Sequence, residues 1–467
     1  MSQSDDIRFL VPALPPRERG RYAIHSVAHA DENKVVDRLL ETVALDEAAQ
    51  RRVQVRAAEL VAGVRERREY QGAMEAFMQE YDLSSEEGVV LMCLAEALLR
   101  IPDDDTAEKL ISDKLSSADW ESHLGKSSSL FVNASTWGLM LTGQIVRPRR
   151  ETQRDFRSAL RRLVNRGGEP LVRTAIRQAM RIMGHQFVMG RTIEEAMERA
   201  DRKRNRAYRY SFDMLGEAAL TQADADRYLE AYRKGIRAVG ERRGEGDIFA
   251  APSISVKLSA LHPRYEFAQR DRVFDELLPR MLELAALARE QDVAFTVDAE
   301  EADRLMLSLD LIGEVLAQPE LDGWNGFGLA LQTYLKTAPA AIDWLAEVAR
   351  RTGHRVPIRL VKGAYWDTEI KHAQVEGFPG YPVFTRKVNT DVSFIACARQ
   401  VLGLRDVFYP QFATHNAHTI AVVTELAGDL GGYEFQRLHG MGEDLYGAVM
   451  ASDEFHSACR VYAPVGS

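Results

Sequence analysis

Eight short apolar runs, each ending in polar or charged residues, follow one another from about residue 209 to the end of the 467-residue chain. Most of them precede a stretch of helical length, and this alternation favours parallel βα units over hairpins. The block spans roughly the 250 residues that a (β/α)8 barrel requires. The sequence therefore predicts an α/β fold with a TIM-like barrel, whose strands lie in 209–216, 253–261, 293–300, 327–334, 356–363, 407–414, 433–440 and 460–466.

The segment 271–291 illustrates the helical pattern between two of these runs. Leucine and methionine recur in it at helical spacing, and Pro279 is expected to kink the helix. A doubly wound open sheet is the alternative architecture for such an alternation. It is disfavoured because no glycine-rich GxGxxG segment follows an early run.

Polar residues stand in or just after the predicted strands. Catalytic groups of (β/α)8 barrels sit where strands end and βα loops begin, so these positions are the first candidates for a site. They are Asp213, Lys257, Asp298, Gln332, Arg359, Lys362, His415 and Gln436.

The composition is that of a globular protein, with 46% hydrophobic and 28% charged residues. No run of about 18 uninterrupted apolar residues occurs, so no membrane span is expected. The acidic first residues lack an apolar core, which argues against a signal peptide. Three widely separated cysteines are typical of reduced thiols, and a cytoplasmic location is expected.

The formal net charge of −9 argues against a general nucleic-acid-binding surface. Two basic stretches, 147–166 and 198–210, interleave acids with their arginines, as solvated helix faces do. No nucleic-acid partner is therefore expected.

The first 208 residues are predominantly helical in pattern. The segment 83–101 opens with a capping-box spacing, Ser84 followed by Glu87, and continues as a largely apolar helix. We interpret 1–70 as an N-terminal arm, 71–208 as a helical domain and 209–467 as the barrel. The last run ends with the sequence, so the final barrel helix is expected to be absent.

Two pairs of charges suggest chemistry. Arg359 and Lys362 stand three residues apart and suit an anionic ligand such as a phosphate or a reduced flavin, with a salt-bridged barrel rim as the structural alternative. Lys257 and Asp298, on neighbouring runs, suit the orientation of a substrate carboxylate, with a structural ion pair as the alternative.

Uncharged residues give weaker signals. Two histidines in THNAH (414–418) lack a matching carboxylate or cysteine set, so no metal site is expected. Gln332 and Gln436 suit the polar edge of a ring ligand, and Tyr365 and Tyr462 suit its pocket. Each of these side chains, taken alone, is also typical of an ordinary core.

Long motifs run through the predicted barrel and through the segment LSSEEGVVLMCLAEALLRIPD (83–103) before it. The barrel motifs are SVKLSALHPRYE (255–266), DAEEADRL (298–305), RLVKGAYWDTEIK (359–371), YPVFTRKVNTDVSF (381–394), FATHNAH (412–418), EFQRLHGMGE (434–443) and RVYAPVG (460–466). They resemble the proline dehydrogenase domain of bacterial proline utilization A, and 83–103 resembles that family's helical domain, so the resemblance covers most of the chain.

The resemblance implies an FAD-dependent barrel that oxidises L-proline to 1-pyrroline-5-carboxylate and passes the electrons to a quinone. Lys257 would meet the proline carboxylate, Asp298, Tyr365 and Tyr462 would shape the pocket, and Glu217 would gate it. For full-length members of the family, the resemblance also implies peripheral contact with a membrane. By motif match, Arg359 lies near the flavin N5 and Gln332 near its pyrimidine edge, and the remaining FAD contacts are Lys362, Thr385, Arg386, Thr414, His415, Asn416 and Gln436.

The sequence departs from the family pattern in three respects. The aldehyde dehydrogenase domain of bifunctional members has no counterpart here, and residues 1–50 show no ribbon-helix-helix DNA-binding pattern. The helix that carries the family's carboxylate-clamping arginine pair would follow Ser467. We therefore expect a C-terminally truncated chain with impaired activity on proline. The alternatives are a Schiff-base aldolase that uses Lys257 or Lys362, and a non-catalytic fragment.

Overall fold

The computed structural model describes residues 19–67 and 188–466, apart from positions 204, 245, 453, 454 and 456. Most of the predicted helical domain, 71–208, lies outside the described residues, as does the expected capping box at Ser84 and Glu87. The described arm up to Gly63 and the described residues from Arg191 onward belong to one compact unit.

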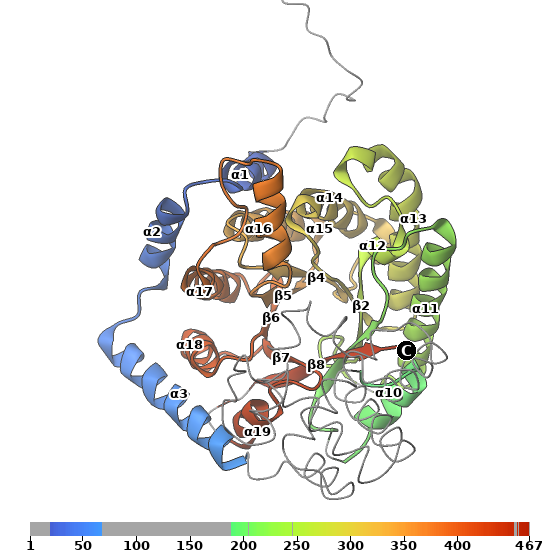
Figure 1. Cartoon of the computed structure of the whole chain (residues 1–467). Helices are drawn as coiled ribbons and strands as arrows, with labels where there is room; N and C mark the ends of the chain where they lie inside the picture. The colour runs from blue at the N-terminus through green and yellow to red at the C-terminus, as the bar shows by residue number, and fades with distance from the viewer. Residues whose placement is uncertain are drawn as a thin grey trace, which may run out of the picture. The chain divides into compact units, whose positions relative to one another are not determined.

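Eight parallel strands close a barrel in chain order, and the last strand pairs with the first (Figure 1). Seven of the predicted runs contain one strand each, and the eighth strand begins two residues before its run, at Ala458. The predicted barrel is confirmed. The strands are β1 (Arg209–Met214), β2 (Ser253–Val256), β3 (Ala294–Val297), β4 (Phe327–Gln332), β5 (Val356–Val361), β6 (Phe408–Ala413), β7 (Glu434–Leu438) and β8 (Ala458–Val465).

One predicted strand boundary is wrong. The run 253–261 divides at Lys257, because its second half forms the short helix α12 (Leu258–Leu261) instead of continuing β2. Both halves are buried and consist of apolar residues and serines. Hydrophobic periodicity does not separate a short buried strand from a short buried helix, and the lysine at the boundary is the only charged residue of the run.

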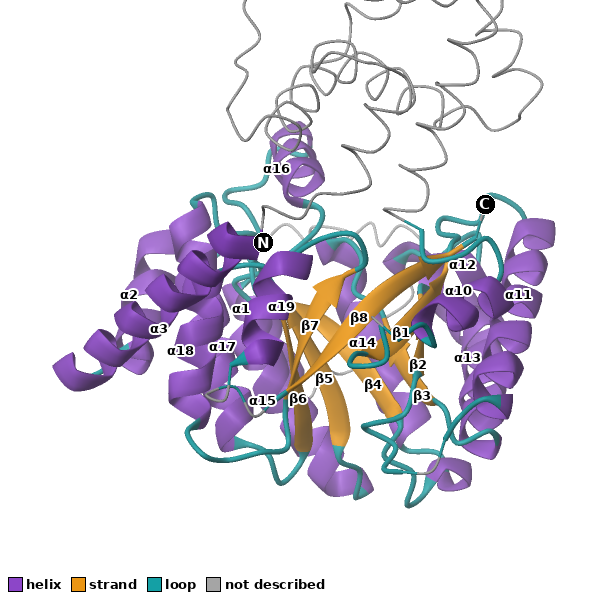
Figure 2. Cartoon of the chain, turned by 90° about the horizontal axis from the view of Figure 1, so that it is seen from below, coloured by secondary structure: helices purple, strands orange, loops and turns teal. Residues whose placement is uncertain are grey.

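Helices surround the strands as an outer ring (Figure 1), and α16 stands above the carboxyl ends of the strands (Figure 2). The predicted helix 271–291 is α13, and Pro279 lies inside it. The helices of the barrel are α10 (Ile193–Ala200), α11 (Gln222–Glu241), α12, α13 (Arg270–Glu290), α14 (Leu305–Leu316), α15 (Ala338–Thr352), α16 (Trp366–Val375), α17 (Lys387–Gly403), α18 (Ala417–Ala427) and α19 (Glu443–Ala451), with 3-10 turns η2 (Phe267–Gln269), η3 (Ala302–Arg304) and η4 (Pro319–Leu321).

Between residues 19 and 67, the described part of the predicted arm, three helices run along the outside of the barrel (Figure 1). They are α1 (Arg19–Val27), α2 (Glu32–Val43) and α3 (Glu47–Arg67). Leu39 of α2 packs on Phe384 and Ala396, and Val53 of α3 packs on α18. The arm therefore meets α15, α17 and α18 in the order in which these helices follow one another in the chain.

None of the helices within the described ranges combines the length and the apolar character that crossing a membrane requires.

Candidate active site

A cluster of four charged side chains and one tyrosine lies at the carboxyl ends of the strands. We call it the carboxyl-end cluster, and it consists of Asp213, Lys257, Asp298, Arg359 and Tyr462. The Lys257 Nζ donates to both carboxylate oxygens of Asp213 at 3.1 and 3.0 Å, to Tyr462 Oη at 3.2 Å and to Asp298 Oδ2 at 3.5 Å. The predicted pair of Lys257 and Asp298 is present, but Asp213 is the closer partner of the lysine.

Arg359 links the cluster to the centre of the barrel and is only 3% exposed. Its Nη1 donates to Asp298 Oδ1 at 2.8 Å, and its Nε donates to Gln436 Oε1 at 2.6 Å. Its Nη2 donates to the hydroxyls of Ser211 and Ser255, both at 3.1 Å. Within the described part of the chain, four of the five N–H donors of the guanidinium are thus engaged, and its orientation is fixed.

The cluster sets the charge state of its members. Burial lowers the pKa of Lys257, but the carboxylates of Asp298 and Asp213 outweigh burial and raise this pKa well above its ordinary value. Burial raises the pKa of Asp213, Lys257 opposes the rise and Asp298 adds to it. Burial, with Asp298 and Asp213, also raises the pKa of Tyr462, so the tyrosine stays protonated and donates to Asp298 Oδ2 at 2.6 Å.

These charge states weigh against the Schiff-base alternative. A lysine that attacks a carbonyl needs a lowered pKa, so that its amine is neutral near neutral pH. Lys257 has a raised pKa, and Lys362 is held in an ion pair with Asp391 at 2.6 Å. The aldolase hypothesis is not supported.

Three further predicted residues lie at or after the carboxyl ends of strands. Gln332 ends β4 and is 2% exposed; its Nε2 donates to the Glu300 carbonyl at 2.7 Å, and its Oε1 accepts from the Ala364 N–H at 2.9 Å. Tyr365 is the N-cap residue of α16, and burial, then Glu217 and Glu300, raise its pKa. Glu217 is exposed in the loop after β1.

The two cations predicted to act together take different partners. Arg359 reaches inward to Asp298, whereas Lys362 reaches outward to Asp391 Oδ1 at 2.6 Å and to Thr419 Oγ1 at 3.2 Å. Asp391 lies on α17, the helix that begins beside the predicted FAD contacts Thr385 and Arg386.

The predicted residues after β6 have clear structural partners. The Thr414 carbonyl accepts a hydrogen bond from the Tyr446 hydroxyl at 2.7 Å. Asn416 is the N-cap of α18, since its Oδ1 accepts from the Thr419 N–H at 2.9 Å. The His415 Nε2 accepts from the Leu438 N–H at 3.0 Å. Burial and then Arg437 lower the pKa of His415, so this imidazole is neutral.

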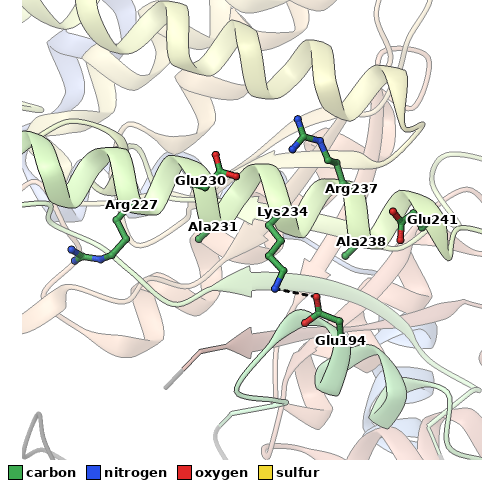
Figure 3. Close-up of a pocket in the computed structure, with 8 residues that line it drawn as sticks. All are labelled: Glu194, Arg227, Glu230, Ala231, Lys234, Arg237, Ala238 and Glu241. Carbon is green, nitrogen blue, oxygen red and sulfur yellow. Dashed lines mark ion pairs between the residues drawn. The ribbon is translucent and has the colours of Figure 1, made fainter.

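A separate surface groove is lined by residues of α10 and α11. It follows the outer face of α11, and the Lys234 Nζ reaches Glu194 Oε1 of α10 across it at 3.2 Å (Figure 3). Both charge signs alternate along its wall, and none of the predicted site residues contributes to it. Its lining consists of Glu194, Arg227, Glu230, Ala231, Lys234, Arg237, Ala238 and Glu241.

Three residues of the site were not assigned a role from the sequence. The sequence indicates Asp213 only as a strand-end position, and Ser211 and Ser255 carry no predicted role. The parallel register explains their convergence, because Asp213 pairs with Ser255 across β1 and β2. Side chains alternate between the two faces of a strand, so Ser211 and Asp213 lie on the same face of β1. This alternation is the sequence pattern that indicates their shared position.

Comparison with known proteins identifies the family. The family model described as proline dehydrogenase matches residues 196–467, more than half of the 467-residue chain. This chain belongs to the proline dehydrogenase family. The family consists of flavin-dependent oxidoreductases. Residues 20–65, which cover most of the described arm, match the model described as the proline utilization A proline dehydrogenase N-terminal domain.

Individual relatives agree with this assignment. The bifunctional protein PutA of Klebsiella aerogenes is 49% identical over 99% of this chain, and that of Escherichia coli K12 is 49% identical over 97%. The chain spans only 36% and 35% of these two relatives. A crystal structure of Bradyrhizobium japonicum proline utilization A, the D779Y mutant, matches with a TM-score of 0.70 at 46% identity, over 94% of this chain and 44% of the other.

A third family model matches residues 73–187 and is described as the DNA-binding domain of proline dehydrogenase. This description stands against the expectation, drawn from net charge, that the chain has no nucleic-acid partner. The matched residues lie outside the described part of the structure, and the expectation stays a prediction.

Proposed function

We propose that this chain oxidises L-proline to 1-pyrroline-5-carboxylate with FAD as its cofactor and passes the electrons to a quinone. The observation that carries the proposal is the carboxyl-end cluster, a protonated lysine and a fixed arginine held by two carboxylates at the mouth of a proline dehydrogenase barrel. Proline is the substrate in the names of the matched family and of several relatives.

The residues present fit a flavin. An amide suits the polar edge of the isoalloxazine ring, and cations suit a reduced ring and a pyrophosphate. Gln332 uses two of the four hydrogen bonds that an amide can make, and Lys362 uses two of its three N–H donors within the described residues. Both therefore keep capacity for a ligand.

We assign FAD to the residues proposed from the motifs. Gln332 would hold the pyrimidine edge and Arg359 would lie beside the reactive part of the ring. FAD, when bound, supplies a two-electron acceptor for the oxidation. The rest of the cofactor would be held by Lys362, Thr385, Arg386, Thr414, His415, Asn416 and Gln436.

The carboxyl-end cluster would orient the substrate. Lys257 is kept charged by its two carboxylates and offers a cation to the carboxylate of proline. Tyr462 keeps its proton, and we assign Tyr462 and Tyr365 to the pocket wall. Glu217, which is exposed in the loop after β1, would gate the entrance.

The acceptor implies where the protein works. A quinone is dissolved in the membrane, so we propose a cytoplasmic protein that touches the membrane surface during turnover.

The test is an absorbance spectrum followed by a turnover assay. Purified chain should carry a yellow flavin chromophore that bleaches when L-proline is added without an acceptor. Arg359→Ala should slow this bleaching, whereas Lys362→Ala should lower the flavin content. A colourless protein that takes up no added FAD would overturn the proposal, and a flavoprotein that proline never bleaches would leave only the non-catalytic alternative.

A further inference from the structure

The segment that precedes α17 is held from outside the barrel by the N-terminal arm. The His29 Nδ1 lies 3.0 Å from the Gly380 carbonyl oxygen, and the Lys336 Nζ donates to the Ala30 carbonyl at 2.8 Å. A Cβ at Gly380 would approach the His29 carbonyl oxygen to 3.2 Å, so the two backbones are in close contact. The arm is thus clasped to the loop that carries Thr385 and Arg386.

Glu32 makes the most extensive contact of this clasp. Its carboxylate accepts from the Thr385 N–H at 3.0 and 3.1 Å and from the Thr385 hydroxyl at 2.8 Å. It also accepts from the Asn389 Nδ2 at 2.6 Å. Arg386, the N-cap residue of α17, makes no side-chain capping bond of its own. A carboxylate from a distant part of the chain therefore lies beside the amino-terminal end of α17, where negative charge is favoured by the helix dipole.

The electrostatics agree with a built contact. Burial raises the pKa of Glu32, but hydrogen bonds from Asn389 and Thr385 outweigh burial, and the pKa is lowered overall. The carboxylate is therefore ionised at neutral pH, and its bonds to the loop are charge-assisted.

The other side of the same helical turn reaches the barrel mouth. Asp391 lies two residues after Asn389 and binds the Lys362 Nζ at 2.6 Å. Lys362 directly follows β5, the strand that carries Arg359. The first turns of α17 thus touch Glu32 on one side and a proposed FAD contact on the other.

We propose that Glu32 is a positioning residue for the cofactor, which acts through Thr385 and, by way of Asp391, through Lys362. This inference rests on the proposed function, because Thr385 and Lys362 are proposed FAD contacts. The arm thereby contributes to flavin retention without touching the flavin itself.

The experiment measures FAD release from the loaded chain after dilution, by the rise in flavin fluorescence. Glu32→Ala removes every bond of the carboxylate and should speed release about tenfold. Glu32→Gln keeps one accepting oxygen and should speed release about threefold. Glu41→Gln is the matched control, since it makes the same charge change at an exposed position on α2, and it should release FAD as the wild type does.

A second pair of variants separates positioning from a general loss of structure. In the Lys362→Met background Glu32→Ala should speed release by clearly less than tenfold, because one of its two routes to the cofactor is already lost. At saturating FAD, the midpoint of thermal unfolding of Glu32→Ala should stay within about 2 °C of the midpoint of Glu41→Gln.

The outcomes are distinct. A wild-type chain that binds no FAD overturns the proposed function and this inference with it. A chain that retains FAD equally well with and without the Glu32 carboxylate overturns the inference alone. A tenfold effect that persists unchanged in the Lys362→Met background also overturns it, because the residues would then act independently.

Discussion

The two ends of the barrel interior each hold a group of buried charges, and the groups differ in how completely the charges are satisfied. At the amino ends of the strands, Glu434 and Arg460 are 0% and 1% exposed, and the Arg460 Nε donates to Glu434 Oε1 at 2.6 Å. Arg209 donates to Glu434 Oε2 at 3.1 Å. We call these three residues the amino-end cluster. Arg460 also donates to the carbonyls of Tyr210 and Ala251, at 3.0 and 2.7 Å.

The pKa directions separate the two clusters. Burial raises the pKa of Glu434, but Arg460 and the bonds to it outweigh burial, so the pKa is lowered overall. Asp213, at the carboxyl end, keeps a raised pKa although Lys257 is only 3.0 Å away. The amino-end cluster therefore favours the ionised form of Glu434, whereas the carboxyl-end cluster disfavours the ionised form of Asp213. Perturbed groups of this kind gather at functional sites.

The comparison also shows that sequence pattern alone does not assign a role. Both clusters arise from inward-facing charged residues on β-strands, and both include an arginine paired with a carboxylate. The two clusters differ in the strand end at which they lie and in the number of hydrogen-bond donors around each carboxylate.

The largest effect is expected from breaking the amino-end cluster. Arg460→Met should lower the free energy of unfolding by about 3–5 kcal/mol, because Glu434 is left buried without its main partner. Denaturant unfolding measures the loss. The double variant Arg460→Met with Glu434→Gln removes the stranded charge and should recover part of it. A loss below about 1 kcal/mol in the single variant would show that this cluster is not the structural one.

A smaller and different effect is expected at the carboxyl end. Lys257→Met should lower kcat/KM for proline by about 10- to 100-fold, which corresponds to one lost charge-assisted bond of about 1.5–3 kcal/mol. The change should appear mainly in KM, because the lysine is proposed to bind the substrate carboxylate in both ground and transition states. Lys234→Met, in the surface groove on α11, serves as the control. Unchanged KM in Lys257→Met would contradict the assigned role.

The barrel itself follows from the sequence because each buried strand is a short apolar run with polar residues at its end. The site follows for a related reason: in a closed parallel barrel all carboxyl ends meet at one mouth, so Lys257, Asp298, Arg359 and Tyr462 had to converge. These four residues do lie in one hydrogen-bonded network.

The choice of partners within the site was not predictable. Lys257 lies closer to Asp213 than to Asp298, and this depends on strand register and on side-chain rotamers that periodicity does not determine. Asp391 has a lysine four residues before it, Lys387, a spacing typical of an exposed helical ion pair, and nothing in that spacing indicates its bond to Lys362.

Contacts between distant segments are the other part that the sequence did not yield. Glu32 follows Asp31, which caps α2, so the local pattern indicates only the first turn of a surface helix. Its contact with Thr385 spans 353 positions and depends on how the arm lies against the barrel. No local sequence pattern indicates a contact between residues so far apart in the chain.

An intermediate test addresses the residue that joins the two clusters. The Gln436 Oε1 accepts from Arg359, and its Nε2 donates to Glu434 Oε1 at 2.9 Å. Gln436→Met should lower the free energy of unfolding by about 1–2 kcal/mol, since Arg359 loses a buried acceptor. Gln374→Met, at an exposed position, should leave stability unchanged. If flavin reduction in Gln436→Met keeps its wild-type rate, the amino-end cluster does not help to orient Arg359.

The smallest expected effect is a difference in pH dependence between the two ends. The pKa of Asp213 is raised above its ordinary value of 3.8, so its contribution to stability is present below that pH and is lost as the pH rises through the folded-state pKa. The pKa of Glu434 is lowered from 4.5, so its contribution is present above that pH and is lost as the pH falls through the folded-state pKa. Between about pH 4 and 7, urea unfolding should therefore show wild-type stability falling relative to Asp213→Asn as the pH rises. Glu290→Gln, at an exposed position, should follow the wild-type curve. A constant difference between wild type and Asp213→Asn across this range would mean that Lys257 neutralises Asp213 as fully as Arg460 neutralises Glu434, and the two ends of the barrel would then be electrostatically alike.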